Sequence, residues 1–238
     1  MLFVAAGTSQ SRAPKVRLLT SLTPVFVMQL ILATTVAAAG NAKLVVAVQQ
    51  NDGRPLVDAA VTVRRIGAAA ASAAAPNATP WVMDQQGLAF APEVIVIPVG
   101  GLVIFPNSDT VSHQVYSFSP AKRFQLPLYR GKPYPPTRFD TAGIVTLGCN
   151  IHDNMIGWVL VTDAPWFGQT DAKGHWESGA LPAGEYEVTI WHPRLRDDVK
   201  SLTSRIKVDP AGIAEARFRF ALPMRPAPLT GKSRQWDY

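Results

Sequence analysis

Residues 93–107 read EVIVIPVGGLVIFPN. Two short runs rich in Val and Ile, 93–99 and 102–106, stand on either side of a pair of glycines. Runs of this length that are bounded by Gly, Pro and Asn are typical of β-strands. The stretch therefore predicts two strands separated by a turn, and it favours a β-protein.

The chain beyond residue 43 repeats this pattern. Turn signals such as NDGRP at 51–55, PNSD at 106–109 and LPAGE at 181–185 separate the strand-like runs. No long stretch after residue 43 has the 3.6-residue period and the caps of a helix. We predict an all-β fold, as a sandwich or a barrel. The further strand-like runs are 43–49, 59–65, 113–118, 143–148, 157–163, 186–191 and 216–220.

The first 39 residues are predicted to be a secretory signal peptide. Three basic residues between positions 12 and 17 precede a long uncharged apolar stretch that ends in Ala37-Ala38-Ala39, the natural cleavage site. An uncleaved membrane anchor is the alternative, because the run is long enough to span a bilayer. We expect a periplasmic or otherwise exported protein with no membrane span after cleavage.

The charge of the chain does not favour nucleic acid as a partner. The whole chain carries a net charge of +6, but its first 39 residues hold three basic and no acidic residues, which leaves the remainder near +3. The basic residues of that remainder are scattered and are not interleaved with stacking aromatic residues.

The chain contains a single cysteine, Cys149, within GCNIHDNMIGW (148–158). Cysteines of exported proteins usually form disulfides, and this one has no partner in its own chain. Three outcomes stay open: a disulfide with another molecule, a free thiol, or a thiolate that binds a metal ion.

The residues that follow Cys149 favour the metal ion. His152 stands three residues after it and Met155 six, a spacing that composition alone would produce rarely. Thiolate, imidazole and thioether suit copper, and a blue-copper site takes two histidines, one cysteine and a weak axial methionine. His113 begins a strand-like run 36 residues earlier and can return beside this loop. The alternative is a buried free cysteine with a histidine and a methionine nearby by chance.

Residues 81–163 resemble a cupredoxin, most of all the amicyanin or methylamine-utilisation type of blue copper protein. FAPEVIVIPVGGLVIFPN (90–107) resembles the family's strand, turn and strand that lead to an asparagine six residues before the first histidine. FDTAGIVTLGC (139–149) resembles the approach to the ligand cysteine, and the Cys-x-x-His-x-x-Met loop is that of amicyanin. The resemblance implies a Greek-key sandwich that binds one type 1 copper ion through His113, Cys149, His152 and Met155. It also implies that Asn107 ties the two ligand loops together.

Two residues depart from the family pattern. Gly148 replaces the aromatic or polar residue that usually precedes the cysteine, and Asp153 replaces a proline beside the second histidine. In the family this proline stiffens the loop and lines a docking patch. Its absence puts the partner surface in doubt but not the ligand set.

The segments on either side of this region resemble the two halves of a carboxypeptidase-regulatory-like β-sandwich, which is an Ig-like fold. The first half is KLVVAVQQNDGRPLVDAAVTVRR (43–65) and the second is GQTDAKGHWESGALPAGEYEVTIWHP (168–193). We predict that the cupredoxin domain is inserted into this sandwich. The plainer interpretation is that 43–65 only adds strands to the cupredoxin. His175 and His192 are expected to be surface residues without a metal.

The predicted boundaries follow from these resemblances and from composition. They are a signal peptide at 1–39, a discontinuous sandwich at 43–66 and 166–221, a low-complexity linker at 67–80, a cupredoxin domain at 81–163 and a Pro-rich tail at 222–238.

The segment 119–139 is basic, rich in proline and free of acidic residues. We expect an extended surface loop, because the prolines forbid a long helix. The alternative is a docking face for an acidic partner, formed by Lys122, Arg123, Arg130, Lys132 and Arg138.

The function expected from these observations is the transfer of single electrons between protein redox partners, without catalysis of bond making. Storage or delivery of copper is an alternative, and a non-redox β-sandwich module with a vestigial site is another.

Overall fold

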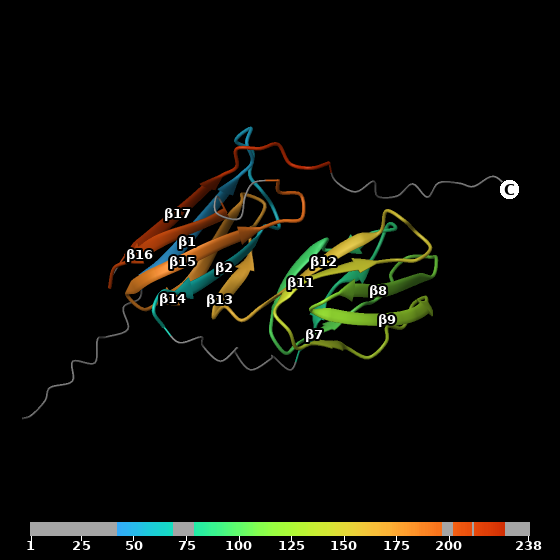
Figure 1. Cartoon of the computed structure of the whole chain (residues 1–238). Helices are drawn as coiled ribbons and strands as arrows, with labels where there is room; N and C mark the ends of the chain where they lie inside the picture. Colours follow the sequence, from blue (N-terminus) through green and yellow to red (C-terminus); the bar gives the residue numbers. More distant parts are fainter. Residues whose placement is uncertain (1–41, 69–78, 197–201, 211, 227–238) are drawn as a thin grey trace, which may run out of the picture. The chain divides into compact units, whose positions relative to one another are not determined.

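The computed structural model describes residues 42–68, 79–196, 202–210 and 212–226, which form an all-β structure (Figure 1). The predicted fold class is confirmed. Within these ranges no helix is long and apolar enough to cross a membrane. The predicted signal peptide, most of the predicted linker and residues 227–238 of the predicted tail lie outside the described residues.

Strands from the two ends of the described chain, blue and orange to red in Figure 1, form one β-sandwich. One sheet has the order β14-β1-β17, in which β1 is antiparallel to β14 and parallel to β17. The other has the order β13-β2-β15-β16 and is antiparallel throughout. The bounds are β1 Ala42–Gln49, β2 Ala60–Arg65, β13 Trp166–Gln169, β14 His175–Leu181, β15 Gly184–Trp191, β16 Thr203–Val208 and β17 Ile213–Arg219.

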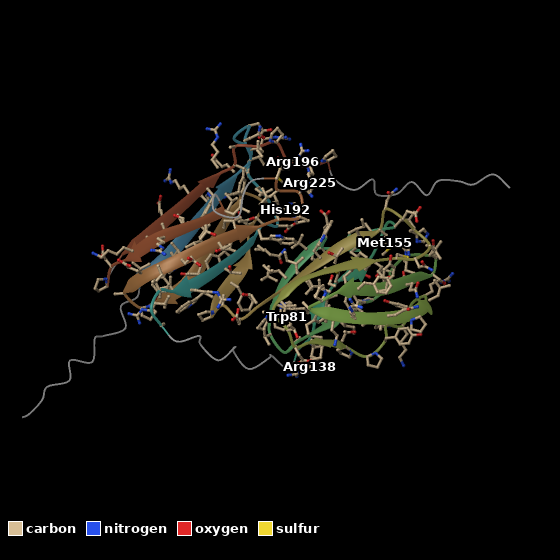
Figure 2. All side chains as sticks on the ribbon, in the orientation of Figure 1. Trp81, Arg138, Met155, His192, Arg196 and Arg225 are labelled. Carbon is tan, nitrogen blue, oxygen red and sulfur yellow. The ribbon has the colours of Figure 1, made fainter. Side chains whose placement is uncertain are left out.

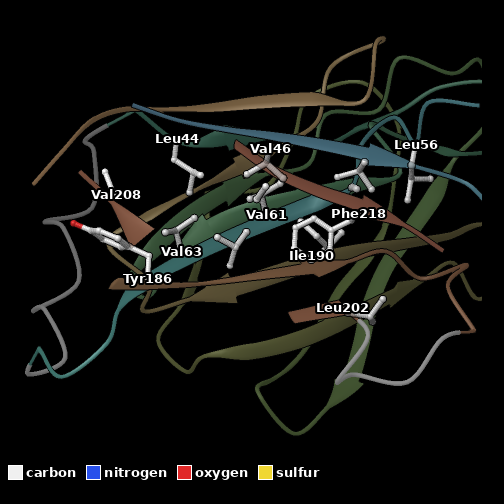
Figure 3. Close-up of a cluster of buried hydrophobic side chains, with 14 of the residues drawn as sticks. Leu44, Val46, Leu56, Val61, Val63, Tyr186, Ile190, Leu202, Val208 and Phe218 are labelled. Atoms are coloured by element: carbon white, nitrogen blue, oxygen red, sulfur yellow. The ribbon is translucent and has the colours of Figure 1, made fainter. Parts of the chain in front are cut away.

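The core of this sandwich follows from the two-residue period of its strands. Alternate residues of β1, among them Leu44 and Val46, are fully buried, whereas Lys43 is exposed. Val61 and Val63 of β2 meet them from the other sheet, with Tyr186 of β15 in the same cluster (Figure 3). Two amphipathic sheets bury their apolar faces against each other, which is the main favourable term in the free energy of folding.

Residues 81–162, green to yellow in Figure 1, form a second sandwich. Its larger sheet has the order β6-β12-β11-β8-β9, in which β6 and β12 are parallel and the other pairs antiparallel. The smaller sheet has the order β10-β7-β3, and β4 and β5 form a short ribbon. The bounds are β3 Trp81–Val82, β4 Asp84–Gln85, β5 Phe90–Ala91, β6 Val94–Pro98, β7 Gly101–Ile104, β8 His113–Ser119, β9 Lys122–Tyr129, β10 Thr137–Phe139, β11 Gly143–Gly148 and β12 Ile156–Thr162.

The core of the second sandwich reaches the region that sequence analysis assigned to copper. Val145 and Leu147 of β11 and Val159 of β12 point into it, and the same cluster contains Cys149 and Met155. The loop that carries the predicted ligands is therefore continuous with a closely packed interior, which resists displacement of its side chains.

Strands β1 and β2 precede the second sandwich in sequence, and every strand with which they pair follows it. The chain thus leaves the first sandwich, forms the second and returns. The predicted domain boundaries and the resemblance to the carboxypeptidase-regulatory fold stay predictions.

The expectation of an extended surface loop over 119–139 is wrong. Residues 122–129 form β9, which pairs with β8 as a hairpin, and residues 137–139 form β10. Apolar side chains alternate along β9, so that Phe124 and Leu126 pack against the core. Pro127 is tolerated because β9 is the edge strand of its sheet, where a missing backbone N–H removes no bond to a further strand.

Candidate metal centre

Three side chains from two separate segments meet in the second sandwich. His113 begins β8, and Cys149 and His152 lie in the loop between β11 and β12. The Cys149 Sγ atom lies 3.8 Å from His113 Nδ1 and 3.5 Å from His152 Nδ1, and the two Nδ1 atoms are 3.1 Å apart. A circle through the three atoms has a radius of about 2.0 Å, close to the length of metal–imidazole and metal–thiolate bonds.

The loop that carries two of these atoms is short because its ends are hydrogen-bonded strands. Gly148 of β11 pairs with Ile156 of β12, and the Met155 amide donates to the His152 carbonyl oxygen at 2.9 Å. Met155, labelled in Figure 2, is 1% exposed and belongs to the same buried cluster as Cys149. Its predicted role as axial ligand stays a prediction.

His113 is completely buried and stands beside an irregularity in the sheet. It pairs with Tyr129 of β9, whereas Val115 pairs with Leu126, so that β9 carries one extra residue at this point. Such a β-bulge bends a strand and redirects nearby side chains. The imidazole presents Nδ1 to Cys149 and Nε2 to Asp109.

Asp109 fixes the orientation of the His113 ring. Its Oδ2 atom lies 2.7 Å from His113 Nε2, so a proton on Nε2 is donated to the carboxylate and Nδ1 keeps a free lone pair. The Gly87 amide donates to Asp109 Oδ1 at 2.6 Å, and the Leu88 amide donates to Oδ2 at 2.9 Å.

These hydrogen bonds also keep Asp109 ionised. Burial opposes the charge, but the bonds from the Leu88 amide, His113 and the Gly87 amide outweigh it and hold the pKa of the Asp109 carboxyl below its usual value. The site therefore contains a fixed negative charge next to one predicted ligand.

His152 is the half-buried member of the group. Burial, and then the neighbouring His113, hold the pKa of His152 below its usual value, while Asp109 acts in the opposite direction. The neutral imidazole is the form that binds a metal.

Asn107 shapes the loop that leads to His113. Its amide nitrogen donates to the carbonyl oxygens of Val111 and Tyr129, and its Oδ1 accepts from the Asp109 amide. None of these three bonds reaches the loop 149–155. These bonds hold the His113 loop to β9, and the role of Asn107 in joining the two ligand loops stays a prediction.

Sequence analysis missed Asp109 and Tyr129. The Tyr129 hydroxyl donates to the Phe105 carbonyl oxygen and accepts from Gln85 Nε2, and burial raises the pKa of Tyr129 to about 12. An acid four residues before His113, in the same turn, was a signal that could have identified Asp109. Tyr129 offered no signal, because only the β8–β9 pairing brings it to His113.

The donor set fits copper. One thiolate and two imidazole nitrogens in a triangle are the equatorial ligands of a blue-copper site, and a thioether is its weak axial ligand.

The five cations of the predicted docking face are spread along the chain from β9 to β10. Lys122 and Arg123 begin β9, Arg130 donates to the Thr110 carbonyl oxygen, Lys132 follows β9, and Arg138 is paired with Asp140.

The two other histidines lie in the first sandwich. His175 is exposed, but the expectation that His192 is a surface residue is wrong, because it is only 6% exposed. The Arg194 amide donates to His192 Nδ1, and burial lowers the pKa of His192 to about 4. The group of converging metal-binding side chains found among the described residues contains neither histidine.

Comparisons with known proteins found solved structures with a similar fold. No family model matches the chain, and no curated protein matches it. A variant of oxidised amicyanin is 18% identical, with a TM-score of 0.33 over 42% of this chain and 99% of its own. A purple cupredoxin from Nitrosopumilus maritimus is 24% identical, with a TM-score of 0.30 over 34% of this chain and 96% of its own.

A third solved structure is a Cu-containing nitrite reductase from Thermus scotoductus SA-01. It is 24% identical, with a TM-score of 0.34, and the match covers 48% of this chain and 28% of the reductase. TM-scores of this size give no support of their own to a shared function.

Proposed function

We propose that this protein is an exported, cupredoxin-type protein that binds one type 1 copper ion and transfers single electrons between protein partners. The observation that carries the proposal is the triangle formed by Cys149 Sγ, His113 Nδ1 and His152 Nδ1, whose radius of about 2.0 Å suits one shared ion. Met155 would complete the ligand set as a weak axial donor.

Bound copper would supply a one-electron couple, and the residues of this chain would keep its surroundings unchanged between the two oxidation states. His113 is held by Asp109 on one side and by the β8–β9 pairing on the other. Cys149 is 4% exposed and packed in the core. Side chains fixed in this way rearrange little when an electron arrives or leaves, which favours fast transfer.

His152 is the proposed exit for the electron, because it is the half-buried member of the ligand group. We expect no catalysis of bond making. Four protein donors would occupy the coordination sphere, whereas catalytic metal sites keep a position for water or substrate.

A visible absorption spectrum tests the proposal. We expect copper-loaded protein to show an intense visible band that ascorbate removes and an oxidant restores. The Cys149→Ser variant should lack the band, because the band requires the copper–thiolate bond. Far-UV circular dichroism of both proteins controls for folding.

Two results would contradict the proposal. One is a copper-loaded wild-type protein without the intense band. The other is a band whose copper is lost to a mild chelator within the time of a redox cycle, which would instead indicate storage or delivery of copper.

A further inference from the structure

The outer face of the larger sheet in the second sandwich is apolar and aromatic. Val115 and Ser117 of β8 are buried, so the alternate residues Tyr116 and Phe118 point away from the core. Their ring centroids are 5.2 Å apart, and Phe118 is 71% exposed. Exposed apolar surface that spans several strands typically marks a site of protein interaction. The same alternation in the two neighbouring strands turns outward Ile144, Trp158 and Leu160.

A groove of about 500 Å³ lies beside the aromatic pair on this face. Gly148, which lines it, pairs with Tyr116 of β8 and with Ile156 of β12, so these three residues form one row across the sheet. A Cβ atom at Gly148 would lie 2.8 Å from Cζ of Tyr116, which shows that the tyrosine ring lies directly over this backbone. The middle of the groove is therefore shallow and apolar.

The two sides of this row carry opposite charges. Arg123 pairs with Phe118 across the β8–β9 hairpin and is exposed, so the two side chains stand next to each other on the outer face. Among the described residues that line the groove, Asp153 alone is charged, and it lies in the loop that follows β11. Neither Arg123 nor Asp153 takes part in the salt bridges found in the described residues.

The register of the sheet places these charges at opposite ends of the face. Strands β8 and β11 are antiparallel, and Tyr116 is opposite Gly148, the last residue of β11. Phe118 and Arg123 therefore lie on the side of the row toward the start of β11, whereas Asp153 lies beyond its end.

A face with this arrangement is complementary to itself. A two-fold axis that lies between two copies and passes over the row of Tyr116 exchanges the two ends of the face. It sets Arg123 of each copy against Asp153 of the other, and it turns Phe118 of each copy toward Ile156 of the other. A partner of a single charge sign would instead meet one like charge at one end of the face.

We propose that this face joins two copies of the chain in a symmetric dimer. Phe118 supplies the apolar contact at its centre, and the two Arg123–Asp153 pairs determine how the copies are oriented. The dimer requires no copper, so this inference goes beyond the proposed function, and each can fail without the other.

Sedimentation equilibrium of the purified protein, with and without copper, tests the proposal. We expect a monomer–dimer equilibrium with a dissociation constant in the micromolar range or tighter. Phe118→Ser should weaken dimerisation by about 30-fold, because a central aromatic side chain is lost twice in a symmetric interface. A wild-type protein that stays monomeric at about 100 μM would overturn the proposal and leave the groove to a partner of another kind.

Charge reversal tests the pairing of Arg123 with Asp153. Arg123→Glu sets two acids against each other at both contacts, and Asp153→Arg sets two bases against each other. Each variant alone should dimerise about tenfold more weakly than the wild type. An equimolar mixture of the two should associate about as tightly as the wild type, because both contacts of the mixed dimer then join an acid and a base.

Lys132→Glu is the matched control. It makes the same change of charge at an exposed residue that follows β9 and does not line the groove. It should change the dissociation constant by less than about twofold, and its mixture with Asp153→Arg should restore nothing. Equal weakening by Lys132→Glu and Arg123→Glu would overturn the proposal, and so would a mixture of Arg123→Glu with Asp153→Arg that associates no better than its components. Far-UV circular dichroism confirms that each variant is folded.

Discussion

Asp109 is the residue whose replacement tests the candidate metal centre most directly. In the wild-type protein its Oδ2 accepts from His113 Nε2 at 2.7 Å and from the Leu88 amide, and its Oδ1 accepts from the Gly87 amide. All three groups are donors. In Asp109→Asn an NH₂ group must face at least one of them. The orientation that keeps the oxygen on His113 and Leu88 directs the NH₂ group at the Gly87 amide.

The expected loss of copper affinity in Asp109→Asn follows from these contacts. The variant loses one hydrogen bond and the negative charge behind His113, and the Asp109 side chain is only 14% exposed, so solvent screens little of the loss. Removal of such a partner of a metal-binding histidine typically weakens metal binding by about 10- to 100-fold. The anionic partner favours copper(II) over copper(I). If the loss falls on copper(II) alone, each factor of ten raises the reduction potential by about 59 mV, so we expect a rise of about 60–120 mV.

A redox titration of the visible band measures this shift, and competition with a chelator measures the loss of affinity. Asp140→Asn is the matched control, because Asp140 is exposed and paired with Arg138. It should leave both quantities unchanged. A potential that stays constant or falls in Asp109→Asn, with copper still bound, would refute the role assigned to the carboxylate.

Two further predictions concern packing and pH. Gly148→Ala should destabilise the fold by about 0.5–1.5 kcal/mol, because its Cβ would push the far end of the half-buried Tyr116 ring off its rotamer. Tyr116→Ala in the same chain should remove this added cost. Urea unfolding of the single and double variants measures both, and the same effect of Gly148→Ala with and without Tyr116 would contradict the contact. His192 is neutral when folded, since burial lowers its pKa to about 4, but it is protonated below about 6.5 when unfolded. The stability that it contributes is therefore complete above pH 6.5 and declines by up to about 3 kcal/mol as the pH falls to 4, and His192→Gln should abolish this part of the decline in unfolding experiments.

Local patterns in the sequence predicted much of the fold. The apolar runs correspond to strands β1, β2, β6, β7, β8, β11, β12, β15 and β17, because an alternating or continuous apolar run with turn residues at its ends needs only nearby residues to be recognised. Strand β9 was not recognised. The prolines of the segment 119–139 indicated a loop, and only the position of β9 at the edge of the sheet makes Pro127 acceptable there.

The candidate site, like the fold, could be predicted from the sequence only in part. The spacing of Cys149, His152 and Met155 lies within one short loop, so the sequence alone determined that a thiolate, an imidazole and a thioether would be close together. The same reasoning proposed His113 but could not supply its distance. Burial of His192, which directly follows β15, could not be read from its neighbours in sequence.

The tertiary structure alone decided the position of His113 beside Cys149, the hydrogen bonds from the Gly87 and Leu88 amides to Asp109, and the placement of Tyr116 against Gly148. Each of these depends on contacts between segments far apart in sequence, and the register of distant strands is determined by packing of the whole sheet and not by any local run of residues. Sequence by itself determined which donor atoms are available; only the pairing of β8 with β9 and β11 decided that three of them face one point in space.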